Sequence, residues 1–123
     1  MTKKRITVKS AKAKGRILQN WVAEKISQLL NIPYGKDELI SSREMGQSGT
    51  DVRLIGKSLE LFPFSVECKS TESWQIHEAI KQAKDNKKDG TDWLLFMKRS
   101  RQEPVVIMDA ERFFELYKTY LEK

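Results

Sequence analysis

The stretch FSVECKSTESWQIHEAIKQAKDNKKDGTDWLLFMK, residues 64–98, decides the fold of this chain. Its first seven residues include aromatic and β-branched side chains, which favour a strand. Apolar residues then recur at helical spacing, at Ile76, Ala79 and Ile80, before the strand-like run DWLLFMK. Two strands joined through a helix predict a crossover connection and a mixed sheet. The stretch therefore predicts an α/β fold.

The helix in this stretch has signals at both of its ends. Thr71 and Ser73 are candidate N-caps, because their hydroxyls can accept a hydrogen bond from a free amide of the first turn. Gly90 follows the last apolar residues, where helices often stop in a left-handed conformation. We therefore expect the helix to occupy the middle of residues 71–90.

The flanking segments complete the order of elements. Apolar residues at helical spacing predict a first helix over about residues 15–31. ELISSREM and TDVRLI predict a hairpin around the turn GQSG, and KSLELFP predicts a short helical turn or a loop. PVVIM predicts a last strand, and DAERFFELYKTYLEK a terminal helix with Asp109 as its N-cap. The predicted order is α-β-β-β-α-β-β-α.

The length and composition bound the domain organisation. With 123 residues, the chain is long enough for one domain and too short for two of ordinary size. We predict a basic, flexible N-terminal arm over residues 1–14 and a single domain over residues 15–123. One cysteine excludes an internal disulfide and a cysteine-based zinc site. No run of residues has the length of a membrane span or the pattern of a secretory signal, so we expect a cytoplasmic protein.

The positive charge is concentrated at the start of the chain. The net charge is +6, and residues 1–16 contain seven basic residues and no acid, which leaves 16 basic and 17 acidic residues in the remainder. The seven are Lys3, Lys4, Arg5, Lys9, Lys12, Lys14 and Arg16. A second basic cluster consists of Lys98, Arg99 and Arg101. Both clusters suit DNA, because each phosphate that is neutralised releases counterions; the alternative is a solvated tail that aids solubility.

Charged side chains flank the cysteine of the strand FSVECKS. Glu67 and Lys69 share one face of this strand, while Val66 and Cys68 share the other, which we expect to be buried. Asp51 begins the preceding strand, and adjacent strands lie about 5 Å apart. The carboxylates of Asp51 and Glu67 could therefore bind one divalent cation, with the backbone carbonyl of Cys68 as a further ligand. Lys69 would then orient a water or offset charge on a phosphoryl group, although a lone Glu-x-Lys can also be a simple ion pair.

These residues and their order resemble the PD-(D/E)xK, or restriction-endonuclease-like, nuclease superfamily. The similarity rests on KGRILQNWV, REMGQSGTDVRL, FPFSVECKS, EAIKQAKDN and VVIMDAERFFELY, and it spans about residues 14–118. Together these stretches resemble small phage and prophage members, some of which are Holliday junction resolvase-like nucleases. The resemblance implies an αβββαβ core whose mixed central sheet is flanked by helices. One departure is Thr50, which precedes Asp51 where the superfamily motif has proline.

The resemblance also assigns roles to residues. It implies that Asp51 and Glu67 bind Mg²⁺, with Mn²⁺ as a candidate substitute, and that Lys69 assists the attacking water. It implies that Gln82 contacts a metal-bound water or the scissile phosphate, although this residue could also be an ordinary polar residue on the flank of its helix. Many members carry a glutamate on the first helix that reaches the metal. Periodicity makes Gln19, on the border of the apolar stripe, a better candidate metal ligand than Glu24.

Two further polar residues are weaker candidates. His77 is the only histidine of the chain, but it falls on the opposite flank of its helix from Gln82 and has no orienting acid nearby. Gln75 lies on the same flank as Gln82, two turns earlier, where a structural role is favoured.

The expected function is that of a magnesium-dependent endodeoxyribonuclease, and the resemblance favours branched or recombination-intermediate DNA as substrate. The alternatives are a phage nicking or restriction-like endonuclease without junction preference, and a non-catalytic DNA-binding module. Cutting two strands of a junction needs two active sites, so we expect a homodimer formed through Phe113, Phe114 and Tyr117 of the last helix. The alternative for this aromatic stripe is the core of the monomer. We expect no membrane partner and no organic cofactor.

Overall fold

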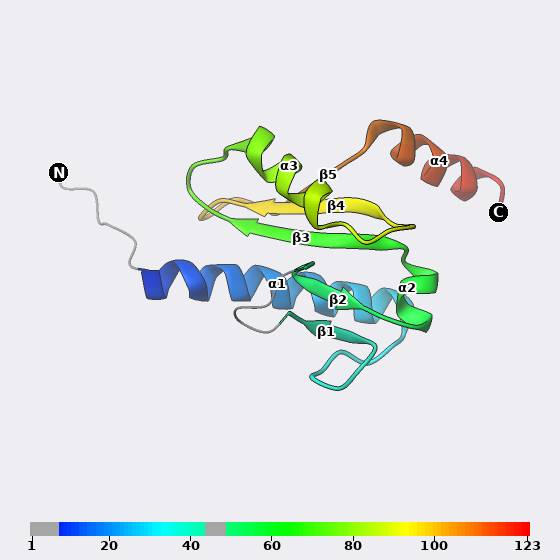
Figure 1. Cartoon of the computed structure of the whole chain (residues 1–123), viewed down its shortest axis with the longest axis horizontal. Helices are drawn as coiled ribbons and strands as arrows, with labels where there is room; N and C mark the ends of the chain where they lie inside the picture. Colours follow the sequence, from blue (N-terminus) through cyan, green and yellow to red (C-terminus); the bar gives the residue numbers. More distant parts are fainter. Residues whose placement is uncertain (1–7, 44–48) are drawn as a thin grey trace.

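The computed structural model describes residues 8–43 and 49–123, which form an α/β fold with a five-stranded mixed sheet flanked by helices (Figure 1). The elements are α1 (Val8–Leu30), β1 (Ile40–Ser42), β2 (Val52–Leu54), α2 (Lys57–Leu61), β3 (Phe64–Ser70), α3 (Ile76–Asn86), β4 (Asp92–Lys98), β5 (Val105–Met108) and α4 (Ala110–Leu121). This order confirms the predicted one. The segment predicted as a helical turn or loop forms the short helix α2.

The strands are arranged in the sheet in sequence order, from β1 to β5. β3 and β4 are parallel and are joined through α3, which confirms the predicted crossover, while the other neighbouring strands are antiparallel. β1 and β2 form the predicted hairpin, and most of its turn, residues 44–48, lies outside the described residues. Because β3 and β4 are the central strands, both faces of each must be covered.

The alternation of side chains along the central strands gives the sheet two buried faces. Val66 and Leu94 belong to a cluster that packs against α1 through Leu18 and Val22. Residues of the opposite face form a second cluster with α3, which consists of Ala79, Ala83, Trp93, Leu95 and Met97. The sheet therefore lies between α1 on one side and α3 on the other (Figure 1).

Helix α1 begins earlier than the sequence predicted. Its first residue is Val8, seven residues before the predicted start, so residues 8–14 of the predicted arm belong to the helix. The segment VKSAKAK is rich in alanine and lysine, which are good helix formers, and its Lys14 side chain donates to Ser100 Oγ at 2.8 Å. The boundary at residue 15 was therefore wrong, and residues 1–7 of the predicted arm lie outside the described residues.

The N-terminus of α3 also differs from the prediction. The N-cap is Gln75, whose side chain makes no capping hydrogen bond. Thr71 and Ser73 lie too early, and the Thr71 hydroxyl donates to the carbonyl of Ser73 within the preceding loop. At the other end the helix stops at Asn86, before Gly90, which has the left-handed φ of 80° that the sequence suggested.

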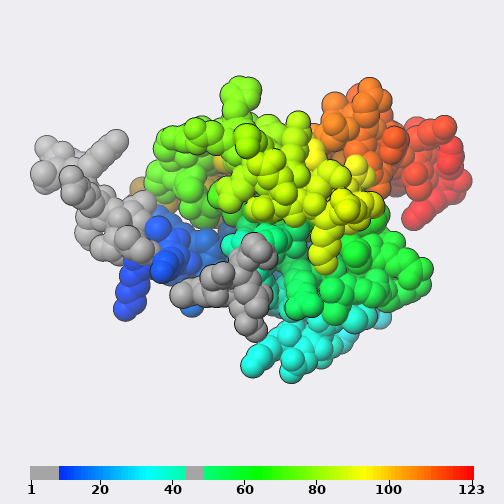
Figure 2. Space-filling view, viewed as in Figure 1, coloured from blue at the N-terminus to red at the C-terminus, as the bar shows by residue number. Residues whose placement is uncertain are grey.

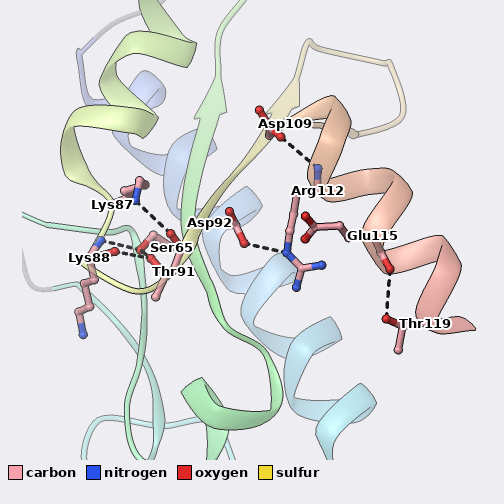
Figure 3. A network of polar contacts seen from close by, with 9 residues as sticks. All are labelled: Ser65, Lys87, Lys88, Thr91, Asp92, Asp109, Arg112, Glu115 and Thr119. Carbon is pink, nitrogen blue, oxygen red and sulfur yellow. Dashed lines mark hydrogen bonds and ion pairs between the residues drawn. The ribbon is translucent and has the colours of Figure 1, made fainter.

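Helix α4 is attached to the sheet through polar contacts near its N-terminus (Figure 3). The Asp109 carboxylate accepts a hydrogen bond from the backbone N–H of Arg112 at 3.0 Å, which confirms the predicted N-cap. Arg112 Nε donates to Asp92 Oδ2 at 2.7 Å, and its guanidinium lies 5.0 Å from the ring centre of Phe64. No residue of α4 is buried, so the interpretation of its aromatic stripe as monomer core is wrong. The helix, orange to red in Figure 2, stands at one end of the molecule.

None of the helices in the described part of the chain is both long and apolar enough to cross a membrane.

Candidate active site

The carboxylates of Asp51 and Glu67 lie together where β2 and β3 meet. The backbone N–H of Asp51 donates to the carbonyl of Val66 at 2.9 Å. Val52 pairs with Val66 in the antiparallel register, so Asp51 and Glu67 are the residues directly next to this pair on the two strands. Both side chains are withdrawn from solvent, since Asp51 is 9% exposed and Glu67 is 2% exposed. The structure thus brings together two acids that are far apart in the sequence.

The surroundings of Glu67 disfavour its ionised form. Burial raises the pKa of Glu67, the nearby negative charge of Asp51 raises it further, and the result is a pKa of about 8. Two groups act in the other direction: Asn86 Nδ2 donates to Glu67 Oε1 at 3.1 Å, and the positive charge of Lys69 lowers the pKa. The Lys69 side chain makes no hydrogen bond or ion pair with the residues that the structure describes. The predicted alternative of a simple Glu67–Lys69 ion pair is therefore not what these residues form.

Further contacts hold Asp51 in place. Its Oδ1 pairs with Arg43 Nη2 at 3.1 Å, and its Oδ2 accepts a hydrogen bond from the backbone N–H of Cys68 at 2.8 Å. The side-chain amide of Gln19 donates to the main-chain carbonyl of Asp51. Each carboxylate oxygen has two lone-pair positions, so both oxygens retain capacity for a further ligand.

Asp51 and Glu67 line a pocket between α1, the β2–β3 junction and α3, with a volume of about 660 Å³. We call this cavity the acid pocket. Its lining residues are Lys12, Gly15, Arg16, Gln19, Asn20, Ser42, Arg43, Asp51, Glu67, Cys68, Lys69 and Gln82. The pocket thus contains the six residues that the sequence favoured for catalysis or metal binding, namely Gln19, Asp51, Glu67, Cys68, Lys69 and Gln82. It also contains Lys12 and Arg16 of the predicted DNA-binding set, because these residues and Gln19 follow one another along one side of α1.

Cys68 contributes backbone atoms to this pocket. Its side chain packs against the cluster under α1, and burial raises the pKa of its thiol, so the sulfur is a poor nucleophile. Its N–H points toward Asp51, and within a strand the N–H and C=O of one residue point to the same side. The Cys68 carbonyl therefore lies on the Asp51 side of β3, as a candidate ligand must.

Other candidate residues lie outside the acid pocket. Glu24 and His77 are exposed, and neither lines it. Gln75 lines an adjoining hollow, to which Lys69 and Gln82 also contribute. Of the two helix α1 candidates, only Gln19 is therefore placed to reach the acids.

Two residues that contact the acids were missed by the sequence reasoning. Arg43 follows β1 directly and reaches Asp51 across the hairpin, a contact that depends on strand pairing and has no local signal. Asn86 could have been found, because it lies four residues after Gln82 and thus on the same flank of α3. Its amide contact with Glu67 is the strongest hydrogen-bonding influence that lowers the pKa of this acid.

The predicted DNA-binding residues other than Lys12 and Arg16 lie outside the acid pocket or outside the described residues. Lys3, Lys4 and Arg5 lie outside the described residues, and Lys9 is exposed on the first turns of α1. Lys14, Lys98 and Arg101 line one hollow, which brings the N-terminal half of α1 beside the β4–β5 loop. Arg99 lies 5.9 Å from the ring centre of Trp74. Lys14 of the first basic cluster is therefore a neighbour of the second cluster in space.

In the described part of the chain, no group of three or more histidine, cysteine, aspartate and glutamate side chains could hold a metal ion. The candidate ligands of the acid pocket are instead the two carboxylates, the main-chain carbonyl of Cys68 and the side-chain amide of Gln19. Together, the fold and the pocket define an α/β protein with two paired, buried carboxylates at the edge of an open cavity. Comparisons with models of protein families, with curated proteins and with solved structures found no match for this chain.

Proposed function

We propose that this protein is a magnesium-dependent endodeoxyribonuclease with the restriction-endonuclease-like αβββαβ core of the PD-(D/E)xK superfamily. The observation that carries the proposal is the convergence of Asp51, Glu67 and Lys69 in one pocket, at the junction of the strands that the sequence motif assigns to them. A non-catalytic DNA-binding module is disfavoured, because two buried carboxylates repel each other and gain nothing in a site without a cation.

The residues of the acid pocket fit a hard divalent cation. The mutual repulsion that raises the pKa of Glu67 is the kind of electrostatic cost that a bound cation removes. Mg²⁺ typically uses one or two protein carboxylates and fills its other positions with water and substrate phosphate oxygens, so a set of only two acids suffices. Asp51, Glu67 and the Cys68 carbonyl would hold the ion, with Gln19 as a further candidate. When bound, Mg²⁺ supplies charge stabilisation at the phosphate and lowers the pKa of a water.

The side chains around the acids then have distinct tasks. Lys69 lies close enough to influence the charge of Glu67, and its ammonium can orient the attacking water or offset negative charge on the phosphoryl oxygens. Gln82, which also lines the acid pocket, can donate to the same phosphate or water. Arg43, Asn86 and the Gln19 amide position the two acids through their hydrogen bonds.

The proposal is tested by cleavage of supercoiled plasmid DNA. We expect Asp51→Asn and Lys69→Ala each to lower the rate of Mg²⁺-dependent cleavage by about 100-fold or more. EDTA should abolish the cleavage, and Mn²⁺ should restore it. Glu24→Gln is the matched control, because this exposed acid of α1 lies outside the acid pocket. Cleavage that survives both pocket substitutions would show that the active site is elsewhere.

The substrate is proposed to be branched DNA, on the resemblance described above. A panel of four-way junction, flap, single-stranded and linear duplex DNA of equal length separates this proposal from a nicking or restriction-like enzyme. Equal rates on junction and linear duplex would reject the preference for branched DNA and leave the nuclease proposal intact.

A further inference from the structure

A second hollow adjoins the acid pocket and has a volume of about 640 Å³. The two cavities share Ser42 and Arg43 in their linings, so they lie side by side. Its other lining residues are Tyr34, Gly35, Lys36, Ser41, Gly49, Thr50, Arg53 and Lys88. We call this cavity the basic hollow.

The side chains of the basic hollow carry charge of one sign. Lys36, Arg43, Arg53 and Lys88 line it, and none of the described lining residues is acidic. Lys36, Arg53 and Lys88 are exposed and have no ion pair within the part of the chain that the structure describes. Like charges that gather without partners raise the local positive potential, which attracts an anion.

The backbone beneath these cations is fixed by hydrogen bonds. The N–H of Lys88 donates to Ser65 Oγ at 2.9 Å, and its carbonyl accepts from Thr91 Oγ1 at 2.7 Å (Figure 3). Arg53 pairs with Ser41 in the hairpin register. Lys36 follows Gly35, whose N–H donates to the carbonyl of Ile40 at 3.0 Å. Three segments that are distant in the sequence thus each place a basic residue at one cavity, and hydrogen bonds fix the backbone of each segment.

A neutral hydrogen-bonding link joins the basic hollow to α1. The Tyr34 hydroxyl lies 2.6 Å from Ser42 Oγ and donates to Asn20 Oδ1 at 2.7 Å. Asn20 and Ser42 both line the acid pocket, while Tyr34 and Ser42 line the basic hollow. The wall between the two cavities therefore consists of polar groups, which suits a hydrated, charged chain more than an apolar ligand.

We propose that the basic hollow binds the phosphodiester backbone of the DNA strand beside the scissile phosphate. This inference rests on the proposed nuclease function, since a phosphate held at Asp51 and Glu67 belongs to a strand that must continue beyond the acid pocket. The basic hollow adjoins that pocket, and its cations, with no acid among the described lining residues, favour a phosphate backbone there. Phosphate contacts of this kind position the strand and carry no sequence information.

The test compares two variants that each remove three positive charges. K36Q/R53Q/K88Q changes the basic hollow, and K57Q/K118Q/K123Q changes lysines that line neither cavity. Both are made together with Asp51→Asn, and DNA binding is measured by fluorescence anisotropy at several salt concentrations. The plot of log K against log salt has a negative slope, and each lost phosphate contact makes this slope shallower by about 0.9. The slope of the hollow variant should therefore be shallower than that of the parent by about 2 to 3. The control variant should retain the parental slope.

The outcomes separate this inference from the proposed function. A hollow variant with the slope of its control overturns the inference, whatever the cleavage assays show. A reduced slope supports it even if Asp51→Asn fails to abolish cleavage, in which case the nuclease site is wrong and the strand path remains. Saturable binding of inorganic phosphate at the hollow, with an unchanged slope on DNA, would identify a small-anion site and also reject the strand path. If the triple variant loses its circular dichroism spectrum, the three single substitutions replace it, each with an expected slope loss of about 1.

Discussion

At the level of single residues, Glu67 combines burial with a close acidic neighbour. Its pKa of about 8 lies above the ordinary value of 4.5, so the folded protein without metal retains a proton that the unfolded chain releases. Between these two values, the native state binds more protons than the unfolded state, and the free energy of unfolding must fall as pH rises. The acid pocket is therefore a source of instability in the metal-free protein.

We expect Glu67→Gln to stabilise the metal-free protein at alkaline pH. An amide cannot ionise, so the variant avoids the loss of stability that the parent suffers between about pH 4.5 and pH 8. Since one pKa unit corresponds to about 1.4 kcal/mol, we expect a relative gain in the free energy of unfolding of about 1–3 kcal/mol at pH 9 over pH 5. The measurement is urea unfolding in EDTA at both pH values.

Glu72 provides a control, because its pKa is shifted in the opposite direction from that of Glu67. The pKa of Glu72 is lowered, chiefly by its hydrogen bond with Ser100 and also by the charge of Lys14. The ionised Glu72 stabilises the folded protein above the pKa of the unfolded chain, and this stabilisation disappears as pH falls. Glu72→Gln should therefore lower the free energy of unfolding at neutral and higher pH and leave it unchanged at low pH. Parallel pH curves for Glu67→Gln and the parent would contradict the described environment of Glu67.

At the level of elements, α1 links the core to the pocket. Leu18 and Val22 pack under the sheet, whereas Lys12, Arg16 and Gln19 face the acid pocket. The helix can serve both purposes because it extends to Val8, beyond the apolar stripe that made its C-terminal part recognisable. Periodicity identifies a helix by its buried face, so the earlier turns, which bury little, gave no such signal.

The extension of α1 predicts a stabilising substitution at Gly15. This glycine lies inside the helix, and a Cβ added to it would have no atom within 4 Å. Gly15→Ala should therefore raise the free energy of unfolding by about 0.5–1 kcal/mol, measured by urea unfolding. Gly90→Ala is the comparison, because its φ of 80° makes any side chain unfavourable and the variant should be less stable. No gain from Gly15→Ala would indicate that residues 8–14 add little to the helix.

At the level of the whole molecule, α4 exposes an apolar surface that the monomer does not cover. Its exposed apolar residues are Phe113, Phe114, Leu116, Tyr117, Tyr120 and Leu121, each between 44% and 68% exposed. An aromatic side chain has about 150–250 Å² of surface, so the four aromatic residues alone expose about 450 Å². A patch of this size is large for a monomer and approaches the roughly 800 Å² that each partner contributes to a typical interface.

The homodimer expected from the sequence thus remains a prediction, with α4 as its interface. The protein should have twice the chain mass of 14.3 kDa in light scattering coupled to gel filtration. Phe114→Glu together with Tyr120→Glu should give the monomer mass, because two charges would have to be buried in the interface. Leu29→Glu, at a 70% exposed position of α1, should leave the mass unchanged. A parent protein that is monomeric at all concentrations would reject the prediction.

Local chemistry made much of this molecule predictable from its sequence. The period of two in FSVECKS and the helical period after it fixed the strand, the crossover helix and the parallel β3–β4 pair. The residue types of Asp51, Glu67 and Lys69 indicated a phosphate-hydrolysing site, and the acid pocket contains all three. The strand and helix signals depend on neighbours within a few residues, and the site signal depends on residue types and their order in the chain, so neither requires knowledge of tertiary contacts.

The tertiary structure alone decided the remaining features. The ion pair of Arg43 with Asp51 follows from the strand register, and the basic hollow gathers Lys36, Arg53 and Lys88 from three separate segments. The exposure of the α4 stripe likewise depends on how this helix is attached through Arg112. Amphipathic periodicity predicts that a helix has an apolar face but cannot say what covers it, because burial is a property of the packed chain and not of the segment.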